Sequence, residues 1–381
     1  MPKSIIIIAG EPSADMHGAA LTRQLKISNP DLIISGVGGP QMRKAGVKTF
    51  DDLTQYAVIG FIEVLRHYHI FKKAFDLTLA KIKREQPIAV ILIDYPGFNL
   101  RLAKRIKQDI PQTKIIYYIS PQIWAWGRKR INLIKQTIDK MLVVFKFEET
   151  LYKENGVNAE FVGHPLLEKF TELKPEKETL KNMNLSTEDR ILSILPGSRV
   201  NEVKKLMPVM LKAAELLQKK MPEINFLLIR ASNISLDLIN KLARNYAHLN
   251  LRIIDRQTYN AINISSFAWV CSGTATLETA ILGIPMLVLY KTSFLTWFAS
   301  KLLIGLPSIG LVNIVAGKKI VPEFIQYQVT PANIIKASCD FFNLSPEKQA
   351  GIKQQLAKVK LNLGISNANK NAAKAIAALI G

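Results

Sequence analysis

Short runs of branched aliphatic residues alternate along the chain with longer segments whose apolar residues recur every three or four positions. The runs are typical of strands buried on both faces of a parallel sheet, and the longer segments predict amphipathic helices. The runs read "SIIIIAG", "DLIISGVG", "IAVILID", "KIIYYIS" and "MLVVFKF", followed by "RILSILPGS", "NFLLIRA", "LRIID", "FAWVCSG" and "PMLVLYK". The alternation predicts an α/β protein of two Rossmann-like, doubly wound domains that face a cleft.

A charged, weakly patterned stretch separates the two series of runs. We therefore expect an N-terminal domain over residues 1–166, a linker over 167–190 and a C-terminal domain over 191–345. Residues 346–381 are rich in lysine and have a helical pattern throughout. These last helices could pack back on the N-terminal domain or be exchanged in a dimer.

Composition narrows the class of protein without choosing a ligand. The chain holds 51 Lys and Arg against 30 Asp and Glu, a formal net charge of +21. Such a charge attracts nucleic acid, anionic lipid and phosphorylated substrates alike. The only cysteines, Cys271 and Cys339, are far apart, which fits a reduced cytosolic compartment and offers neither a disulfide nor a zinc site. We expect no export segment and no membrane-spanning helix.

The stretch "ILSILPGSRVNEV" predicts a strand that turns directly into a helix. Gly197 and Ser198 would allow close approach to the backbone, and the exposed N–H groups of a helix start favour an anion. Arg199 adds a guanidinium group that suits phosphate oxygens. A capped turn with a solvated arginine has the same sequence, so this stretch alone leaves phosphate binding open.

A second strand-to-helix turn, "FAWVCSGTATLETAI", has the same features. Ser272, Gly273 and Thr274 offer hydroxyl and N–H groups, and Glu278 could accept both hydroxyls of a ribose. The alternative is a capping box in which Glu278 reaches back to its own helix start. Two such turns in one domain favour a nucleotide diphosphate. Because the chain lacks a P-loop, a complete G-x-G-x-x-G and an Asp-x-Asp pair, we expect arginine and helix dipoles to stabilise the diphosphate without a metal or other cofactor.

Candidate residues of the first domain also follow predicted strands. Asp94 in "AVILIDYPGFN" could act as a general base toward a hydroxyl, or could simply cap the turn. Trp124 and the nearby Arg128 would suit a sugar face with a phosphate, a nucleic-acid strand, or a packed interface.

One further segment, "IGFIEVLRHYHIFKKAF", combines an apolar stripe with basic residues. A helix that faces the core gives the same stripe, but the wide apolar face favours an interfacial or lipid-binding surface. The candidate membrane or acyl-chain residues are Phe61, Ile62, Val64, Leu65, Tyr68 and Phe71.

Taken together, nine segments resemble the lipid-A-disaccharide synthase family, the glycosyltransferases that make the disaccharide of lipopolysaccharide. They occur in consistent order from Ala9 to Gln326 and read "AGEPSAD", "GVGGPQM", "IGFIEVL", "IDYPGFN", "SPQIWAW", "FVGHPL", "LPGSRVNEV", "SGTATLE" and "NIVAGKKIVPEFIQ". The resemblance implies the two-domain GT-B fold and an inverting, metal-independent transfer. The substrates would be UDP-2,3-diacylglucosamine and 2,3-diacylglucosamine 1-phosphate, and the products a β-1,6-linked tetraacyl disaccharide 1-phosphate and UDP.

The resemblance also implies roles for individual residues. Asp94 matches the carboxylate suspected as the base, and Arg199 acts with it in catalysis. The UDP contacts would be Gly197, Ser198, Arg199, Glu202, Ser272, Gly273, Thr274, Ala275, Glu278 and Asn313. Glu11, Ser13, Asp15, Trp124 and Arg128 fall on the acceptor side. The protein would lie in the cytoplasm at the inner face of the inner membrane without binding nucleic acid, and a homodimer stays open.

Three positions depart from the family pattern. Ala14 replaces a glycine, and is strained if that position needs a left-handed backbone. Gly127 stands where a basic residue usually follows W-A-W, and "GLVN" leaves Asn313 in a less rigid turn.

Two other functions remain as alternatives. One is another UDP-sugar enzyme of the same fold, such as a UDP-N-acetylglucosamine 2-epimerase or an undecaprenyl-linked sugar transferase. The other is a non-enzymatic basic protein that binds nucleic acid or membrane.

Overall fold

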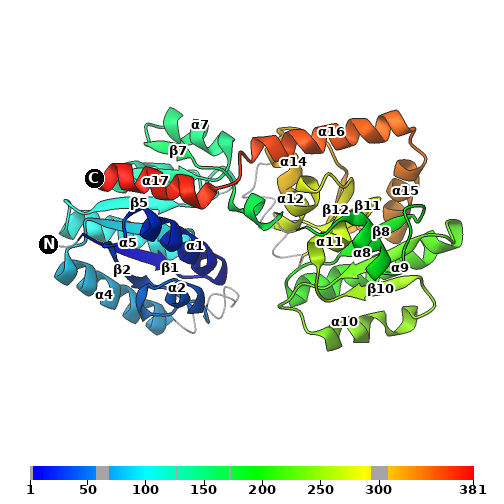
Figure 1. Cartoon of the computed structure of the whole chain (residues 1–381), viewed down its shortest axis with the longest axis horizontal. Helices are drawn as coiled ribbons and strands as arrows, with labels where there is room; N and C mark the ends of the chain where they lie inside the picture. The colour runs from blue at the N-terminus through cyan, green and yellow to red at the C-terminus, as the bar shows by residue number, and fades with distance from the viewer. Residues whose placement is uncertain (1–2, 57–67, 126, 171–172, 293–307) are drawn as a thin grey trace. The chain divides into compact units, whose positions relative to one another are not determined.

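The computed structural model describes residues 3–56, 68–125, 127–170, 173–292 and 308–381. The chain divides into two compact units, and each is a parallel sheet covered by helices (Figure 1). Unit 1 comprises Met1–Glu168 together with Leu363–Gly381, and unit 2 comprises Lys169–Asn362. The predicted α/β fold class of two doubly wound sheets is confirmed.

Unit 1 contains a seven-stranded sheet in the order β3-β2-β1-β4-β5-β6-β7. The isoleucines Ile5–Ile8 are completely buried in its centre, as expected for a strand covered on both faces. Its strands are β1 (Ser4–Ala9), β2 (Ile33–Val37), β3 (Lys48–Asp51), β4 (Ala89–Ile93), β5 (Lys114–Tyr118), β6 (Lys140–Val143) and β7 (Ala159–Phe161). Its helices are α1 (Pro12–Ser28), α2 (Pro40–Lys44), α4 (Tyr68–Glu85), α5 (Pro96–Asp109), α6 (Arg130–Thr137), α7 (Lys146–Glu154) and α17 (Ala368–Ile380). A 3₁₀ turn at Pro165–Phe170 begins in unit 1 and ends in unit 2.

Unit 2 contains a six-stranded sheet in the order β10-β9-β8-β11-β12-β13. Its strands are β8 (Ile191–Leu195), β9 (Asn225–Ile229), β10 (Leu251–Ile254), β11 (Phe267–Cys271), β12 (Met286–Tyr290) and β13 (Glu323–Ile325). Its helices are α8 (Glu176–Asn182), α9 (Val200–Lys220), α10 (Leu236–Ala243), α11 (Thr258–Asn263), α12 (Thr274–Ile281), α14 (Leu311–Ala316), α15 (Pro331–Phe342) and α16 (Pro346–Asn362). Short 3₁₀ turns lie at Arg244–Tyr246 and Gln326–Gln328.

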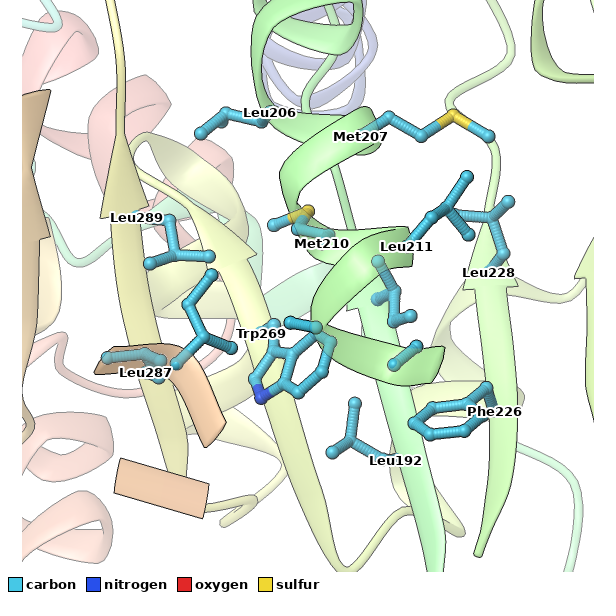
Figure 2. Packing of buried hydrophobic residues seen from close by; sticks show 14 of the residues in the cluster. Leu192, Leu206, Met207, Met210, Leu211, Phe226, Leu228, Trp269, Leu287 and Leu289 are labelled. Carbon is cyan, nitrogen blue, oxygen red and sulfur yellow. The ribbon is translucent and has the colours of Figure 1, made fainter. Parts of the chain in front are cut away.

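The core of unit 2 forms where α9 lies on the sheet. Figure 2 shows Met210 and Leu211 of this helix facing the rings of Trp269 and Phe226, which stand on β11 and β9. All four side chains are fully buried. This packing fixes the start of α9 beside the carboxyl ends of β8 and β11.

Strand order places the predicted site residues. The order reverses at β1 and β4 in unit 1 and at β8 and β11 in unit 2, and ligands of doubly wound sheets bind at such switch points. Asp94 directly follows β4, whereas Gly197 and Ser272 follow β8 and β11 within two residues.

The predicted linker and the predicted C-terminal helices both contain regular helices. Residues 167–190, predicted as a linker, contain α8, which packs on α11 within unit 2. The helices predicted at 346–381 belong to different units. Helix α16 packs on α12 and α14 in unit 2, whereas α17 packs on α1 in unit 1. Within the described ranges, no helix is both long enough and apolar enough to cross a membrane.

Candidate active site

A pocket of about 710 Å³ lies at the switch point of unit 2. It is bounded by the carboxyl ends of β8, β9 and β11 and by the starts of α9, α11 and α12. Every predicted UDP contact except Asn313 lines it: Gly197, Ser198, Arg199, Glu202, Ser272, Gly273, Thr274, Ala275 and Glu278. The structure therefore brings together residues that lie far apart in the chain.

At the start of α9, backbone N–H groups and a guanidinium group point at one carboxylate. The backbone nitrogens of Ser198 and Arg199 each donate to Glu202 Oε2 at 3.2 Å, and Arg199 Nη1 donates to Glu202 Oε1 at 2.8 Å. This ion pair raises the pKa of Arg199. Gly197 has a φ of +122°, and a Cβ there would lie 2.8 Å from Glu202 Oε2. Glycine is therefore required where the backbone meets this side chain.

The start of α12 has no side-chain cap. Gly273 precedes the helix with a φ of +148° and provides no side-chain cap. Thr276 Oγ1 donates to the Gly273 carbonyl at 2.8 Å, and Glu278 Oε1 accepts a hydrogen bond from the Tyr259 hydroxyl at 2.9 Å. The alternative in which Glu278 caps its own helix is therefore wrong. The capping carboxylate of this site is Glu202, on α9.

Several pocket residues were not foreseen from the sequence. Tyr259 lies in α11, which starts after Gln257, a residue with a φ of +66°. Its ring packs on Phe170 with centroids 4.7 Å apart. The segment "DRQTYN" follows a strand, so the search for residues after strands could have found it, but it carries no phosphate-binding motif. Further lining residues are Lys169, Arg230, Ala231 and Ser232.

One further side chain and the set of possible metal ligands bear on the chemistry of the pocket. The Cys271 thiol lines it, and burial raises the pKa of this thiol to about 12, so it stays protonated at neutral pH. In the described ranges, no group of three or more His, Cys, Asp or Glu side chains is arranged to hold a metal ion.

Asn313 does not line the pocket, so the structure does not bring this predicted UDP contact together with the other nine. It lies in α14 rather than in a loose turn, and it is 1% exposed. Its Nδ2 donates to Glu323 Oε1 at 2.7 Å and to the Val321 carbonyl, and its Oδ1 accepts from the Ile320 and Val321 nitrogens. Because two donors and two acceptor positions are all used, the amide has no hydrogen-bonding capacity left for a ligand.

In unit 1, Asp94 stands on a strained turn between β4 and α5. Asp94 and Tyr95 have φ values of +47° and +49°, which non-glycine residues adopt at a cost. The Asp94 carbonyl accepts hydrogen bonds from Asn99 Nδ2 at 2.7 Å and the Tyr117 hydroxyl at 2.5 Å. Burial raises the pKa of the Asp94 carboxyl, opposed in part by the Tyr95 N–H.

The predicted acceptor-side residues differ in their surroundings. Asp15 is buried, and its carboxylate accepts from the Gly39, Gln41 and Met42 nitrogens at 2.8–3.0 Å. These hydrogen bonds join the segment "AGEPSAD" to the segment "GVGGPQM". Glu11 stands at the N-cap of α1, and Ser13 is exposed in the first turn.

The two departures from the family pattern in unit 1 have simple backbone explanations. Ala14 is buried inside α1 and is not one of the residues with positive φ, so the concern about a left-handed backbone at this position was unfounded. Gly127 does have a positive φ, +78°, and a Cβ there would lie 3.4 Å from the Arg130 side chain.

Trp124 is held by a buried carboxyl that the sequence did not point to. Its Nε1 donates to Glu148 Oε1 at 2.9 Å, and its ring meets Phe147 edge-on with centroids 5.3 Å apart. Burial raises the pKa of Glu148 to about 7. Arg128, in contrast, is exposed.

Most of the membrane stripe lies outside the described residues, namely Phe61, Ile62, Val64 and Leu65. Tyr68 is the first residue of α4. Phe71 is half-buried, lies 6.4 Å from the ring of Tyr95, and packs against the core of unit 1. At Phe71 the structure therefore supports the alternative of a helix that faces the core.

Two parallel-sheet α/β units with a pocket at a switch point have the architecture of the GT-B class. Similar solved structures include a UDP-GlcNAc 2-epimerase from Neisseria meningitidis bound to UDP-GlcNAc, with a TM-score of 0.64 and 14% identity over 98% of this chain and 100% of that one. A calicheamicin glycosyltransferase has a TM-score of 0.62 and 12% identity over 100% and 99% of the two chains.

The family model of lipid-A-disaccharide synthetase matches residues 5–380. Lipid-A-disaccharide synthase 1 of Legionella pneumophila (strain Lens) is 42% identical over 365 residues, which are 96% of this chain and 94% of the relative. The synthase of Coxiella burnetii (strain CbuG_Q212) is 38% identical over 378 residues, 99% of both chains. The chain belongs to the lipid-A-disaccharide synthetase family and is a glycosyltransferase of lipid A biosynthesis. This membership excludes the non-enzymatic alternative and the epimerase.

Proposed function

We propose that the enzyme transfers the diacylglucosamine of UDP-2,3-diacylglucosamine to the 6-hydroxyl of 2,3-diacylglucosamine 1-phosphate, with inversion at the anomeric carbon. The pocket of unit 2 carries the proposal, since two helix starts, an arginine and a carboxylate surround a volume suited to the polar part of a nucleotide sugar. The products are the β-1,6-linked tetraacyl disaccharide 1-phosphate and UDP.

The donor half of the proposal assigns the parts of UDP to groups in the pocket. The diphosphate binds at the starts of α9 and α12, where backbone N–H groups and the Arg199 guanidinium stabilise negative charge. The ribose binds Glu278, which Tyr259 orients through one carboxylate oxygen. The charge that develops on the leaving diphosphate is thus matched by preorganised donors.

The acceptor half depends on Asp94. Its carboxylate takes the proton of the 6-hydroxyl while that oxygen bonds to the anomeric carbon, and the bond from this carbon to the diphosphate oxygen breaks with its electron pair leaving on UDP. Burial supports this role, because a raised pKa makes the carboxylate a stronger base. Glu11, Ser13, Trp124 and Arg128 remain acceptor-side candidates, whereas Asp15 and Asn313 are better placed to hold the backbone.

The proposal includes three further expectations. The transfer needs no metal, so EDTA leaves the rate unchanged. The protein binds peripherally to anionic membranes on the cytoplasmic side, which flotation with vesicles of anionic and neutral lipid measures. A homodimer is tested by light scattering.

The deciding experiment incubates the purified protein with both diacylated substrates. Mass spectrometry should detect the disaccharide phosphate and UDP in equal amounts, and the proton coupling at the new anomeric centre should be that of a β-linkage. UDP-N-acetylglucosamine serves as the control donor. An α-linkage, or equal rates with the control donor, would contradict the proposal.

A further inference from the structure

Glu202 stands in the middle of the donors assigned to the diphosphate. Its two carboxylate oxygens accept hydrogen bonds from the backbone N–H groups of Ser198 and Arg199 and from one nitrogen of the Arg199 guanidinium. Two backbone N–H groups at a helix start and a guanidinium are the donor set that protein sites offer to a phosphate group. The same donors cannot serve this carboxylate and a phosphate at full strength.

The surroundings hold Glu202 in this position and leave Arg199 accessible. The Glu202 side chain is 13% exposed, whereas that of Arg199 is 81% exposed although it is paired. Gly197 approaches Glu202 so closely that no side chain fits between them. Asn233 Nδ2 donates to the Ser198 carbonyl at 2.6 Å, which fixes the turn whose N–H groups Glu202 occupies.

We propose that Glu202 is an internal competitor for the diphosphate. Its carboxylate occupies the phosphate-binding donors at the start of α9, rotates away when the nucleotide binds, and returns as UDP leaves. The inference rests on the proposed binding of UDP in this pocket. Its functional value is release, because a product held by helix dipoles and an arginine otherwise leaves slowly.

If Glu202 competes with the diphosphate, two substitutions of this residue should both raise the affinity for UDP. Glu202→Gln removes the charge that holds the internal pairing, and Glu202→Asp keeps the charge on a side chain one methylene too short for contacts that are already 3.2 Å long. Since the binding-competent state becomes more populated, both variants should bind UDP about 10-fold more tightly. In the transferase assay, the inhibition constant of UDP should fall by a similar factor.

Calorimetric titration with UDP and with uridine tests the inference, with Glu215→Gln on the same helix as the matched control. Tighter UDP binding by both variants, with uridine affinity unchanged, supports it. Tighter UDP binding by Glu202→Gln alone would mean that Glu202 only repels the diphosphate by its charge. Weaker UDP binding by both variants would mean that Glu202 positions Arg199 for the nucleotide. Either result overturns the proposal that Glu202 competes with the diphosphate. If neither the original protein nor any variant binds UDP, the proposed function is contradicted together with this inference. Thermal unfolding confirms that the variants are folded.

Discussion

The switch points of the two sheets both require backbone with positive φ, but they use different residues for it. In unit 2 the positions are Gly197 and Gly273, which adopt that conformation without steric cost. In unit 1 they are Asp94 and Tyr95, each of which is strained there. A phosphate site needs bare backbone N–H groups, so glycine suffices. The general base proposed at Asp94 needs a side chain at this turn, so a glycine could not replace it there.

The strained turn is supported by hydrogen bonds to its backbone from side chains of neighbouring elements. Asn99 and Tyr117 both donate to the Asp94 carbonyl, and the Asp94 nitrogen donates to the Tyr118 carbonyl at 3.1 Å. Tyr117 is completely buried on β5. The proposed roles therefore contrast an accessible nucleotide site in unit 2 with a rigidly held base in unit 1. Variants in each unit should separate binding from chemistry.

The largest expected effect separates the two units by kinetics. Asp94→Asn removes the base and should lower kcat by about 10²- to 10⁴-fold, with the UDP dissociation constant within about 2-fold of the original. Arg199→Ala should weaken UDP binding as well as the rate. Steady-state assays and calorimetry measure both, with the exposed Asp31→Asn as control. If Asp94→Asn kept more than a tenth of the rate, the carboxylate would not be the base.

The second prediction tests whether Asn313 binds nucleotide or holds the fold. Asn313→Ala leaves the Glu323 carboxylate and the Ile320 and Val321 nitrogens without their buried partner, and should lower the free energy of unfolding by about 2–4 kcal/mol. Urea unfolding measures the loss, and the exposed Asn343→Ala should change little. A variant that is as stable as the original protein but binds UDP more weakly would instead support a direct contact between Asn313 and UDP.

These cases show why the sequence predicts the pocket better than the roles of single polar residues. Aliphatic runs identify the strands, and the rule that ligands bind beyond their carboxyl ends then locates Gly197 and Ser272. Nothing local reveals whether a polar side chain is already satisfied. The partners of Asp15 begin at Gly39 and the strongest partner of Asn313 is Glu323, so both assignments needed the folded chain.

Tyr259 and Glu148 illustrate the opposite failure. Each orients a predicted residue, Glu278 or Trp124, across a separation of 19 or 24 residues. A lone Tyr in a short helix and a Glu in the first turn of α7 are ordinary residues in a sequence. Their importance arises only from tertiary contacts, which periodicity does not encode.

The third prediction concerns the buried carboxyl of Glu148 in unit 1 and the pH dependence of the free energy of unfolding. The folded-state pKa of Glu148 is about 7 and its unfolded value is 4.5, so the folded protein binds more protons between these values. Stability from this group is full below pH 4.5 and is lost as the pH rises through 7, by about 2–3 kcal/mol. Urea unfolding at pH 5 and pH 8 should show this fall in the original protein and in the exposed control Glu154→Gln, and a smaller fall in Glu148→Gln. Equal falls in all three would contradict the assignment.

The smallest expected effect concerns the first loop of unit 1, where the family glycine is replaced by Ala14. Because Ala14 is helical and buried, glycine gains nothing from its conformational freedom and loses a packed methyl group. Ala14→Gly should therefore lower the free energy of unfolding by about 1 kcal/mol, much as Ala20→Gly would in the same helix. The transferase rate should not change, since the Asp15 contacts to Gly39, Gln41 and Met42 involve only its side chain. A more stable Ala14→Gly protein would mean that α1 is strained at this residue, and that unit 1, like unit 2, needs glycine at its ligand-facing turn.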